Sequence, residues 1–372
     1  MTQAPFLRLR ARGARTDLSH PQFWATAAGL EQAVRDAAAP GGMVLVLGHT
    51  SAPAMALFIA IVAAGRVAAW FPPNAPRQDR ASYFTHQRAA IAHAQPCALF
   101  VDDAALLQTI ASIDPLLASK SFVIGDGPRA DWRADGAADW RADGAADGAA
   151  CRARFLAACN SPDTILVQHS SGTTGLKKPV AITGRMLRAQ FDSYWPLMRR
   201  AGGGGKLRIA SWLPLYHDMG LMAGFLLPLL GGDCLSLLDP FDWIEQPESL
   251  FEMIEQDESC LCWMPNFAFR HLLRLKPAFA PRRLGSVRAW IDCSETCRLA
   301  EAADFEAAFA GWGVWRPSAW RTREPAARAW WWLPKPMGLY RRLIYAEPSR
   351  AQSRIFSWCS RPTCGWWRNA GW

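Results

Sequence analysis

The sequence predicts an α/β protein built on mostly parallel β-sheet, and three observations support this. Short apolar runs bounded by Gly or Pro, typical of buried strands, alternate with longer helical segments. The chain has 372 residues, 51% of them hydrophobic, which is enough for roughly two or three domains and a large core. The longest apolar run, residues 54–64, has about eleven residues, whereas a membrane span needs about 20. We therefore expect a core helix there and no membrane span.

The first part of the chain is expected to alternate helix and strand. A helix is predicted over residues 22–39, because Pro40-Gly41-Gly42 would end it, and another over residues 54–64, closed by Gly65. Buried strands are predicted over residues 43–47, 67–71, 98–101 and 121–124. Next, residues 130–137 repeat identically as 138–145, with a shortened copy to 149. This period is too short for a solenoid, so residues 130–149 are predicted to form a duplicated surface loop.

In the second part, three predicted strands lead into polar segments. The strands cover residues 164–169, 207–213 and 287–291, and helices are expected over residues 186–200, 247–256 and 267–275. The polar segments that follow the strands are residues 170–178, 214–220 and 292–297. These three segments are the candidates for chemistry.

Charge and cysteine usage exclude several classes of function. The net charge is +9, but the last 58 residues carry eleven Lys or Arg and two Glu, so residues 1–314 are balanced and offer no basic face for nucleic acid. The ten cysteines form no CxxC pair and no zinc-finger spacing, so reduced thiols and no metal site are expected. The N-terminal segment lacks the apolar stretch of a secretory signal. We therefore expect a cytoplasmic protein.

The segment after residue 169 has the composition of a phosphate-binding loop. Its glycines allow the backbone to approach a ligand, its hydroxyls and successive N–H groups can donate to phosphate oxygens, and its last lysine adds a charge. A plain surface loop rich in Ser, Thr and Gly is the alternative reading of the motif alone. It is not a Walker A loop, because Gly172 and Gly175 are too close together. The loop residues are Ser170, Ser171, Gly172, Thr173, Thr174, Gly175, Leu176, Lys177 and Lys178.

Together with the other two polar segments, this loop resembles a known family. Residues 170–178 resemble the phosphate loop of the acyl- and aryl-adenylating superfamily, (Ser/Thr)-Ser-Gly-(Ser/Thr)-Thr-Gly-x-Pro-Lys. Residues 211–221 resemble the family's next signature, and their sequence is most similar to that of the fatty-acyl-AMP ligase branch. Residues 292–297 match the segment that borders the adenine in this family. The motifs occur in the family order over roughly residues 25–314. The resemblance implies the large N-terminal domain of the adenylate-forming fold, with stacked, mostly parallel sheets flanked by helices.

The resemblance also implies a reaction and roles for particular residues. A carboxylic acid, in this branch a fatty acid, attacks ATP with Mg²⁺ present, pyrophosphate leaves, and the acyl-adenylate then passes to coenzyme A or an acyl carrier protein. Thr173, Thr174 and Lys178 would hold the β- and γ-phosphates, and His217 would lie beside the acyl carboxylate. The residues expected along the adenine are Cys293, Ser294, Glu295 and Thr296.

Simpler readings of these residues stay open. Taken alone, His217 fits an ordinary core or surface histidine, and Asp218 would orient it or cap the next helix rather than bind metal. The apolar residues 221–230 and 262–269 suit an acyl tunnel or, equally, the core. Cys293 has no identifiable base partner and is a poor candidate for a nucleophile.

The chain departs from the family pattern at its C-terminal end. Pro179 replaces the glycine after the loop lysine, no Tyr-Gly-x-x-Glu segment for magnesium occurs, and no aspartate follows Asp304. Residues 315–372 hold nine of the 19 tryptophans, with no periodicity. We expect residues 1–314 to be an incomplete adenylate-forming domain without its small C-terminal domain, and 315–372 to be a non-native, disordered tail from a frameshift near Val314. The alternatives are a non-catalytic nucleotide-binding remnant and a tail that binds nucleic acid or membrane.

Overall fold

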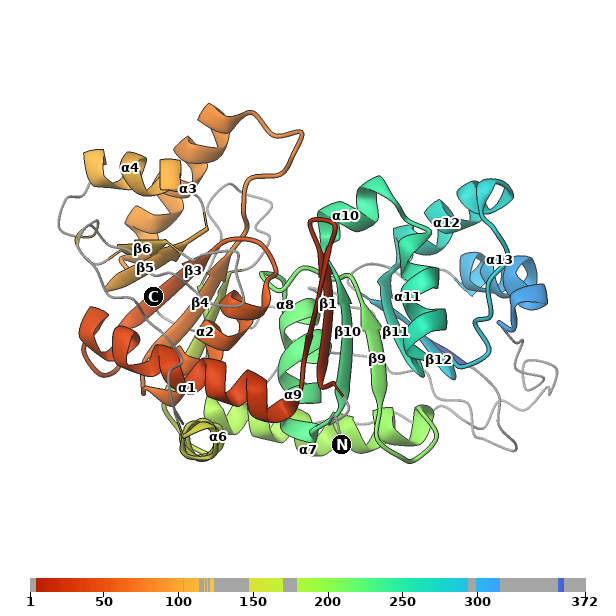
Figure 1. Cartoon of the computed structure of the whole chain (residues 1–372), viewed down its shortest axis with the longest axis horizontal. Coiled ribbons are helices and arrows are strands. Elements are labelled where there is room, and N and C mark those ends of the chain that lie inside the picture. Colours follow the sequence, from red (N-terminus) through yellow and green to blue (C-terminus); the bar gives the residue numbers. More distant parts are fainter. Residues whose placement is uncertain are drawn as a thin grey trace, which may run out of the picture. The chain divides into compact units, whose positions relative to one another are not determined.

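The computed structural model describes residues 5–102, 104–113, 117, 119, 121–123, 147–169, 179–293, 299–314 and 354–357. The chain forms two compact units: Met1–Phe191 with Pro214–Leu221, and Asp192–Leu213 with Met222–Trp372. Each unit contains a mostly parallel sheet flanked by helices (Figure 1), which confirms the predicted α/β class. Among the described residues, no helix is both long and apolar enough to cross a membrane.

The first unit is built on a six-stranded sheet. Its strand order is β6-β5-β3-β4-β7-β8, where the first five strands are parallel and β8 is antiparallel to β7. The strands are β3 (Met43–Leu47), β4 (Val67–Phe71), β5 (Ala98–Val101), β6 (Ser121–Val123), β7 (Thr164–His169) and β8 (Pro179–Thr183). An antiparallel hairpin joins β1 (Leu7–Ala11) to β2 (Ala14–Leu18).

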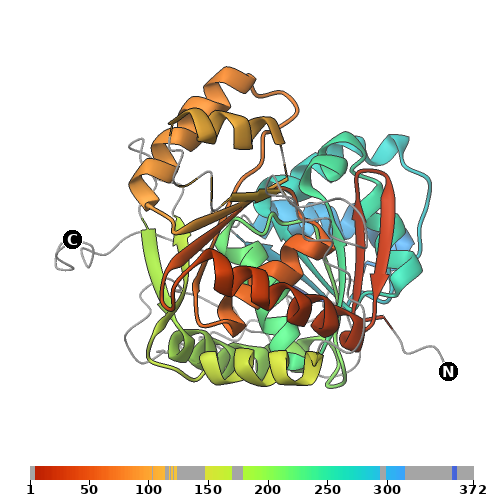
Figure 2. The ribbon, with the colours of Figure 1, turned by 60° about the vertical axis from the view of Figure 1, so that its left-hand side comes forward.

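Helices cover both faces of this sheet because its strands are apolar on both sides. One set of alternate strand residues, including Leu45 and Leu99, packs with side chains of α3 (Arg80–Ala94) and α4 (Ala104–Ile113). On the other face, Trp70 stacks on Phe58 of α2 (Ala52–Ala63) at 5.8 Å between ring centroids. Figures 1 and 2 show these two helix layers on opposite sides of the sheet. The unit also contains α1 (His20–Ala37), α6 (Gly148–Ala158), the first half of α7 (Gly184–Ala201) and α8 (Asp218–Leu221).

The apolar run at residues 54–64 is the buried helix α2. Eleven of its twelve residues are buried, so it is apolar around its whole circumference and needs no membrane. Ser51 caps its N-terminus by accepting a hydrogen bond from the Ala54 amide at 3.2 Å.

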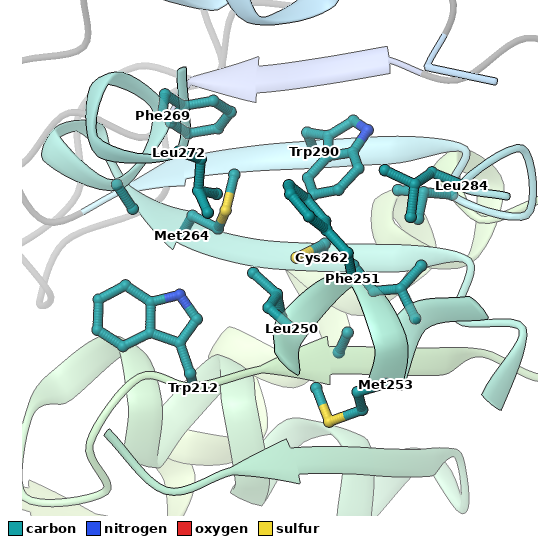
Figure 3. Close-up of a cluster of buried hydrophobic side chains, with 14 of the residues drawn as sticks. Trp212, Leu250, Phe251, Met253, Cys262, Met264, Phe269, Leu272, Leu284 and Trp290 are labelled. Atoms are coloured by element: carbon teal, nitrogen blue, oxygen red, sulfur yellow. The ribbon is translucent and has the colours of Figure 1, made fainter. Parts of the chain in front are cut away.

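The second unit contains five parallel strands in the order β13-β12-β11-β9-β10. They are β9 (Arg208–Ser211), β10 (Cys234–Leu238), β11 (Leu261–Pro265), β12 (Ala289–Cys293) and β13 (Arg354–Ser357). One face packs on α11 (Ser249–Asp257), α12 (Asn266–Leu275) and α13 (Leu299–Phe309) through a cluster that includes Phe251, Phe269 and Trp290 (Figure 3). The remaining helical segments are η1 (Met222–Leu226), α9 (Leu227–Gly231), α10 (Pro240–Glu245), η2 (Lys276–Ala278) and η3 (Ala310–Trp312).

Several predicted boundaries differ from the observed ones for identifiable reasons. Helix α1 begins at His20 because Ser19 and Gln22 form a capping box. Strand β12 starts two residues later than predicted, since the Val287 amide donates to the Leu284 carbonyl in a turn. The predicted surface loop 130–149 lies outside the described residues up to 146. Its last two residues instead begin α6, where the Asp147 carboxylate accepts from the Ala150 amide at 2.9 Å.

Candidate functional site

The predicted phosphate loop joins two paired strands. Residues 170–178 lie outside the described residues, but both ends of the loop are described. Strand β7 ends at His169, β8 begins at Pro179, and these two residues face each other in the antiparallel register. Because β7 runs parallel to β4, the connection leaves the sheet at the carboxyl ends of its parallel strands. This is the edge where open α/β sheets bind their ligands.

Pro179 occupies a position that tolerates proline. It is the exposed first residue of β8, which is the outer strand of the sheet. Proline lacks the N–H that a central strand needs, so the first residue of an edge strand is among the few sheet positions that accept it. The replacement of the family's glycine at this point is therefore compatible with the strand that follows the loop.

The base of the loop contacts the neighbouring strand through aromatic rings. The imidazole of His169 packs edge-on against Phe71, the last residue of β4, with ring centroids 4.6 Å apart. The indole of Trp70 donates to the Gly48 carbonyl at 3.0 Å and so connects the ends of β4 and β3. The carboxyl ends of β3, β4 and β7 are thereby tied together beside the loop.

A charged cluster lies at the same edge, after β3 and β5. Asp102 Oδ2 accepts from the His49 amide at 2.7 Å and lies 2.6 Å from His49 Nδ1. Arg12, at the tip of the β1–β2 hairpin, donates to the same oxygen at 3.4 Å. A Cβ at Gly48 would lie 2.7 Å from Asp102 Cγ, so a larger residue here would displace the Asp102 carboxylate. Burial opposes ionisation of Asp102, but the hydrogen bonds from His49 and the nearby Arg12 charge outweigh it and lower the pKa of the carboxyl group.

The sequence motifs do not point to this cluster. The signal they do carry is positional, since His49 and Asp102 follow buried strands within one or two residues. Which of these strands are neighbours depends on the sheet order β5-β3-β4, and a single sequence does not reveal that order.

His217 lies at the start of a helix in the first unit. Its amide donates to the Pro214 carbonyl at 3.1 Å, and its own carbonyl accepts from the Leu221 amide at 2.9 Å. The imidazole is exposed, with the Tyr216 ring centroid 5.0 Å away. Asp218 Oδ1 accepts from the Met219 amide at 2.8 Å, so its carboxylate bonds to the backbone within the first turn of α8. The chain continues from α8 into η1, a π-helix, a form found frequently at functional sites.

In the second unit, polar residues meet where β11 and β12 end. The Asn266 side-chain amide donates to Asp292 Oδ2 at 2.8 Å, and both residues are buried. Cys293, the last residue of β12, faces Pro265 in the register. The other residues predicted along the adenine, Ser294, Glu295 and Thr296, lie outside the described residues. Asn266 was not predicted as a site residue, because its partner is 26 positions away in the sequence.

No metal-binding site is found among the described residues. Within the ranges given above, no group of three or more His, Cys, Asp and Glu side chains is arranged to hold a metal ion. Among the described residues, Cys151, Cys159 and Cys262 are buried and carry free thiols. Burial raises the pKa of all three thiols, that of Cys159 to about 12, so they stay protonated core side chains.

Comparison with known proteins agrees with the geometry. The family model for AMP-binding enzymes matches residues 4–315. The long-chain-fatty-acid–AMP ligase FadD28 of Mycobacterium tuberculosis is 29% identical over 154 residues, which are 40% of this chain and 27% of that protein. The crystal structure of a fatty acid AMP ligase from Legionella pneumophila superposes with a TM-score of 0.65 at 20% identity, covering 84% of this chain and 50% of that chain.

A second Legionella pneumophila structure, a fatty acyl-adenylate ligase in complex with acyl adenylate and pyrophosphate, gives a TM-score of 0.62 at 19% identity. This chain covers 50% of that structure as well, so it spans about half the length of these solved relatives. The likeness shows the adenylate-forming fold and confirms the fold predicted from the sequence. Since the family model matches residues 4–315 of the 372, the chain belongs to the AMP-binding enzyme family.

Proposed function

We propose that this chain carries the ATP- and acid-binding part of an enzyme that activates a fatty acid as its acyl-adenylate. The family match over residues 4–315 supports this function most directly, because it contains all three motifs in order. Two relatives support the choice of acid, since one is named as a long-chain-fatty-acid–AMP ligase and the other was solved with acyl adenylate and pyrophosphate.

In the proposed reaction, an oxygen of the fatty acid carboxylate attacks the α-phosphorus of ATP. The bond from that phosphorus to the bridging oxygen of the β-phosphate breaks, and pyrophosphate leaves. No protein nucleophile takes part, so catalysis comes from positioning and charge neutralisation. We assign the β- and γ-phosphates to the hydroxyls of Thr173 and Thr174 and to the ammonium of Lys178. The position of this loop at the carboxyl end of β7 supports the assignment.

We assign His217 to the acid. Its exposed imidazole, on the residue just before α8, can donate to a carboxylate oxygen, which would orient the attacking group. Coenzyme A or a carrier-protein thiol would then accept the acyl group. Mg²⁺ would accompany the ATP phosphates, but the described residues form no acidic cluster for it, so we assign it no protein ligand.

Two measurements on the full chain test this function. Calorimetric titration should show ATP binding, and Lys178→Ala should weaken it by about tenfold or more because a charge-assisted contact to phosphate is lost. Lys177→Ala is the matched control, since it removes the same charge from the neighbouring position, and it should change the affinity little. The proposal fails if the wild-type chain does not bind ATP, or if the two variants weaken binding equally.

A non-catalytic nucleotide-binding protein is the second candidate. It is favoured by the sequence after Asp304, which contains no further aspartate and no Tyr-Gly pair. Pyrophosphate release from ATP and a fatty acid separates the two functions. We expect ATP binding with little release from this chain, and rapid release would show that the residues present are sufficient for the reaction.

A further inference from the structure

Two neighbouring helices of the second unit, α10 and α12, each expose one large apolar side chain. Among the described residues, Ile244 and Phe267 are the large apolar side chains that stay exposed, at 54% and 43%. The two helices are in contact (Figure 1), because the ring of Trp243, the residue before Ile244, lies 6.2 Å from the Phe267 ring between centroids. Scattered single apolar side chains need no explanation, but two on adjoining helices indicate a surface that another molecule covers.

The ring of Phe267 is held in place by buried tryptophans. Trp212 and Trp243 are 4% and 1% exposed, and their indoles stack with centroids 3.7 Å apart and planes 7° apart. Phe267 packs edge-on against both indoles, at 5.9 and 6.2 Å between centroids. A side chain that is already fixed loses little conformational entropy when a partner covers it, and aromatic side chains are enriched at the core of protein interfaces. Phe267 therefore has the properties of an anchor for a second protein surface.

Charges of opposite sign lie on the two sides of this apolar pair. On the α10 side, Glu245 ends the helix and Glu248 precedes α11; both are exposed, and neither forms an ion pair with a described residue. On the α12 side, Arg274 is exposed about two helical turns after the anchor and also lacks an ion pair within the described part of the chain. Arg270, between them, pairs with Glu301 at 3.6 Å. The α10 side is thus acidic and the α12 side basic.

We propose that this face, made of Ile244, Glu245, Glu248, Phe267 and Arg274, binds the same face of a second copy of the chain. A two-fold axis through such an interface places the acidic side of one copy opposite the basic side of the other, and the apolar pairs meet in the middle. A partner with charges of one sign would match only one side of this face, whereas a second copy matches both. The proposed reaction uses none of these five residues, so the inference does not depend on that function.

The test is the state of association of the full chain, measured by sedimentation velocity from about 1 to 100 μM. The wild type should form dimers within this range, and Ile244→Ser should weaken the dimer by about tenfold or more because apolar contact is lost.

Charge reversal tests how the two copies are paired. Glu245→Arg and Arg274→Glu should each weaken the dimer by about tenfold, because each places like charges opposite each other at two symmetry-related contacts. An equimolar mixture of these two variants should regain the wild-type affinity, since both contacts of the mixed dimer then join opposite charges. Arg88→Glu is the matched control, because it reverses an exposed charge on α3 that has no ion pair among the described residues. It should leave the dimer unchanged.

Recovery in the mixture is the decisive result, because a loose apolar contact between copies would not respond to complementary reversals. The proposal is overturned if the wild type stays monomeric up to about 100 μM, in which case the face serves a different partner. It is also overturned if Arg88→Glu weakens the dimer as much as Arg274→Glu does, or if the mixture does not recover. If one single variant does not fold, the chain that carries both Glu245→Arg and Arg274→Glu decides in its place, since its own dimer again joins opposite charges.

Discussion

Asp102 organises one edge of the first sheet through a single, partly buried carboxylate. It accepts from both the backbone and the ring of His49 and contacts Arg12 from a distant hairpin. These contacts lower the pKa of Asp102 despite its burial. A carboxyl group whose folded pKa is lowered stabilises the fold at pH values above its unfolded pKa, and this contribution is lost as the pH falls through the folded pKa.

We therefore predict a pH-dependent effect of Asp102→Asn. The variant should be about 1–3 kcal/mol less stable than the wild type near pH 7, because the charge-assisted hydrogen bonds are lost. The difference should stay constant down to about pH 5 and narrow below about pH 4, where the wild-type carboxyl group also becomes protonated. Urea unfolding between pH 3 and pH 7 measures this difference. A gap that is the same at pH 3 and pH 7 would contradict the assigned ionisation.

At this scale the sequence predicts motif residues but not their partners. Ser170 to Lys178 and His217 are recognisable because they are local, with spacing and composition that repeat a known pattern. Asn266 and Asp102 bond to side chains that lie 26 and 53 positions away in the sequence, on or just after other strands. Such pairs depend on strand order and register, which local sequence does not encode.

Among the elements, α1 and α6 are joined by one buried carboxylate. Glu31 on α1 accepts two hydrogen bonds from Arg154 on α6, at 3.0 and 2.7 Å, and also pairs with Arg35 one turn along its own helix. The Glu31 side chain is 2% exposed, whereas that of Arg154 is 44% exposed. Solvent therefore screens the Glu31 carboxylate little, although the Arg154 guanidinium is partly exposed.

Glu31→Gln should lower the free energy of unfolding by about 1–3 kcal/mol, since it replaces a buried charged acceptor between two arginines. The matched control is Asp17→Asn, which breaks the exposed pair with Arg15 and should cost less than about 1 kcal/mol. Thermal or urea unfolding of both variants measures the two costs. Equal losses would mean that burial does not strengthen the α1–α6 link.

The junction between β8 and α7 requires glycine at position 184. A Cβ at Gly184 would fall on the backbone carbonyl of Ala158, at the end of α6, and neither backbone can move away like a side chain. Gly184→Ala should destabilise the chain by about 1–3 kcal/mol or more through overpacking. Gly205→Ala is the control, because its Cβ would meet no atom within 4 Å. A negligible cost at position 184 in unfolding experiments would show that the junction relaxes freely.

The elements themselves were largely predictable. The expected strands at residues 43–47, 67–71 and 98–101 occur at those residues, since a short apolar run that ends at Gly, Pro or Asp has few other ways to be buried. The observed boundaries differ from the predicted ones where a capping side chain or a turn sets the end of the element. Examples are Ser19 before α1 and the turn at Leu284 before β12. The start of α6 at Gly148 was not predicted, because the repeat that precedes it hides the change in pattern.

For the whole molecule, the match to the family ends where the composition changes. The family model covers residues 4–315, and residues 315–372 hold nine tryptophans and the entire net charge. The described part of this segment is β13, which pairs in parallel with β12. We propose that the reading frame changes near Val314. Translating the gene in its other frames beyond codon 314 should recover a Tyr-Gly-x-x-Glu segment, and its absence from both frames would refute the proposal.

The charge distribution gives a second prediction at this scale. Without residues 315–372 the chain would have no net charge, because residues 1–314 are balanced. If the tail binds nucleic acid or anionic lipid, removing it should abolish binding that weakens with salt. We expect DNA and vesicle affinities that are the same with and without the tail, measured by fluorescence anisotropy at several salt concentrations. A large, salt-dependent difference would establish the tail as a binding arm.

The pairing of His169 with Pro179 also has a consequence for protein design. Opposed residues of an antiparallel pair lie about 5 Å apart at their Cα atoms, so the nine residues between them leave and re-enter the sheet at nearly one point. A segment anchored in this way can be exchanged as a cassette, because its replacement need only span that short gap. Loops of other lengths or chemistries could be grafted between these two positions while the paired strands keep their register.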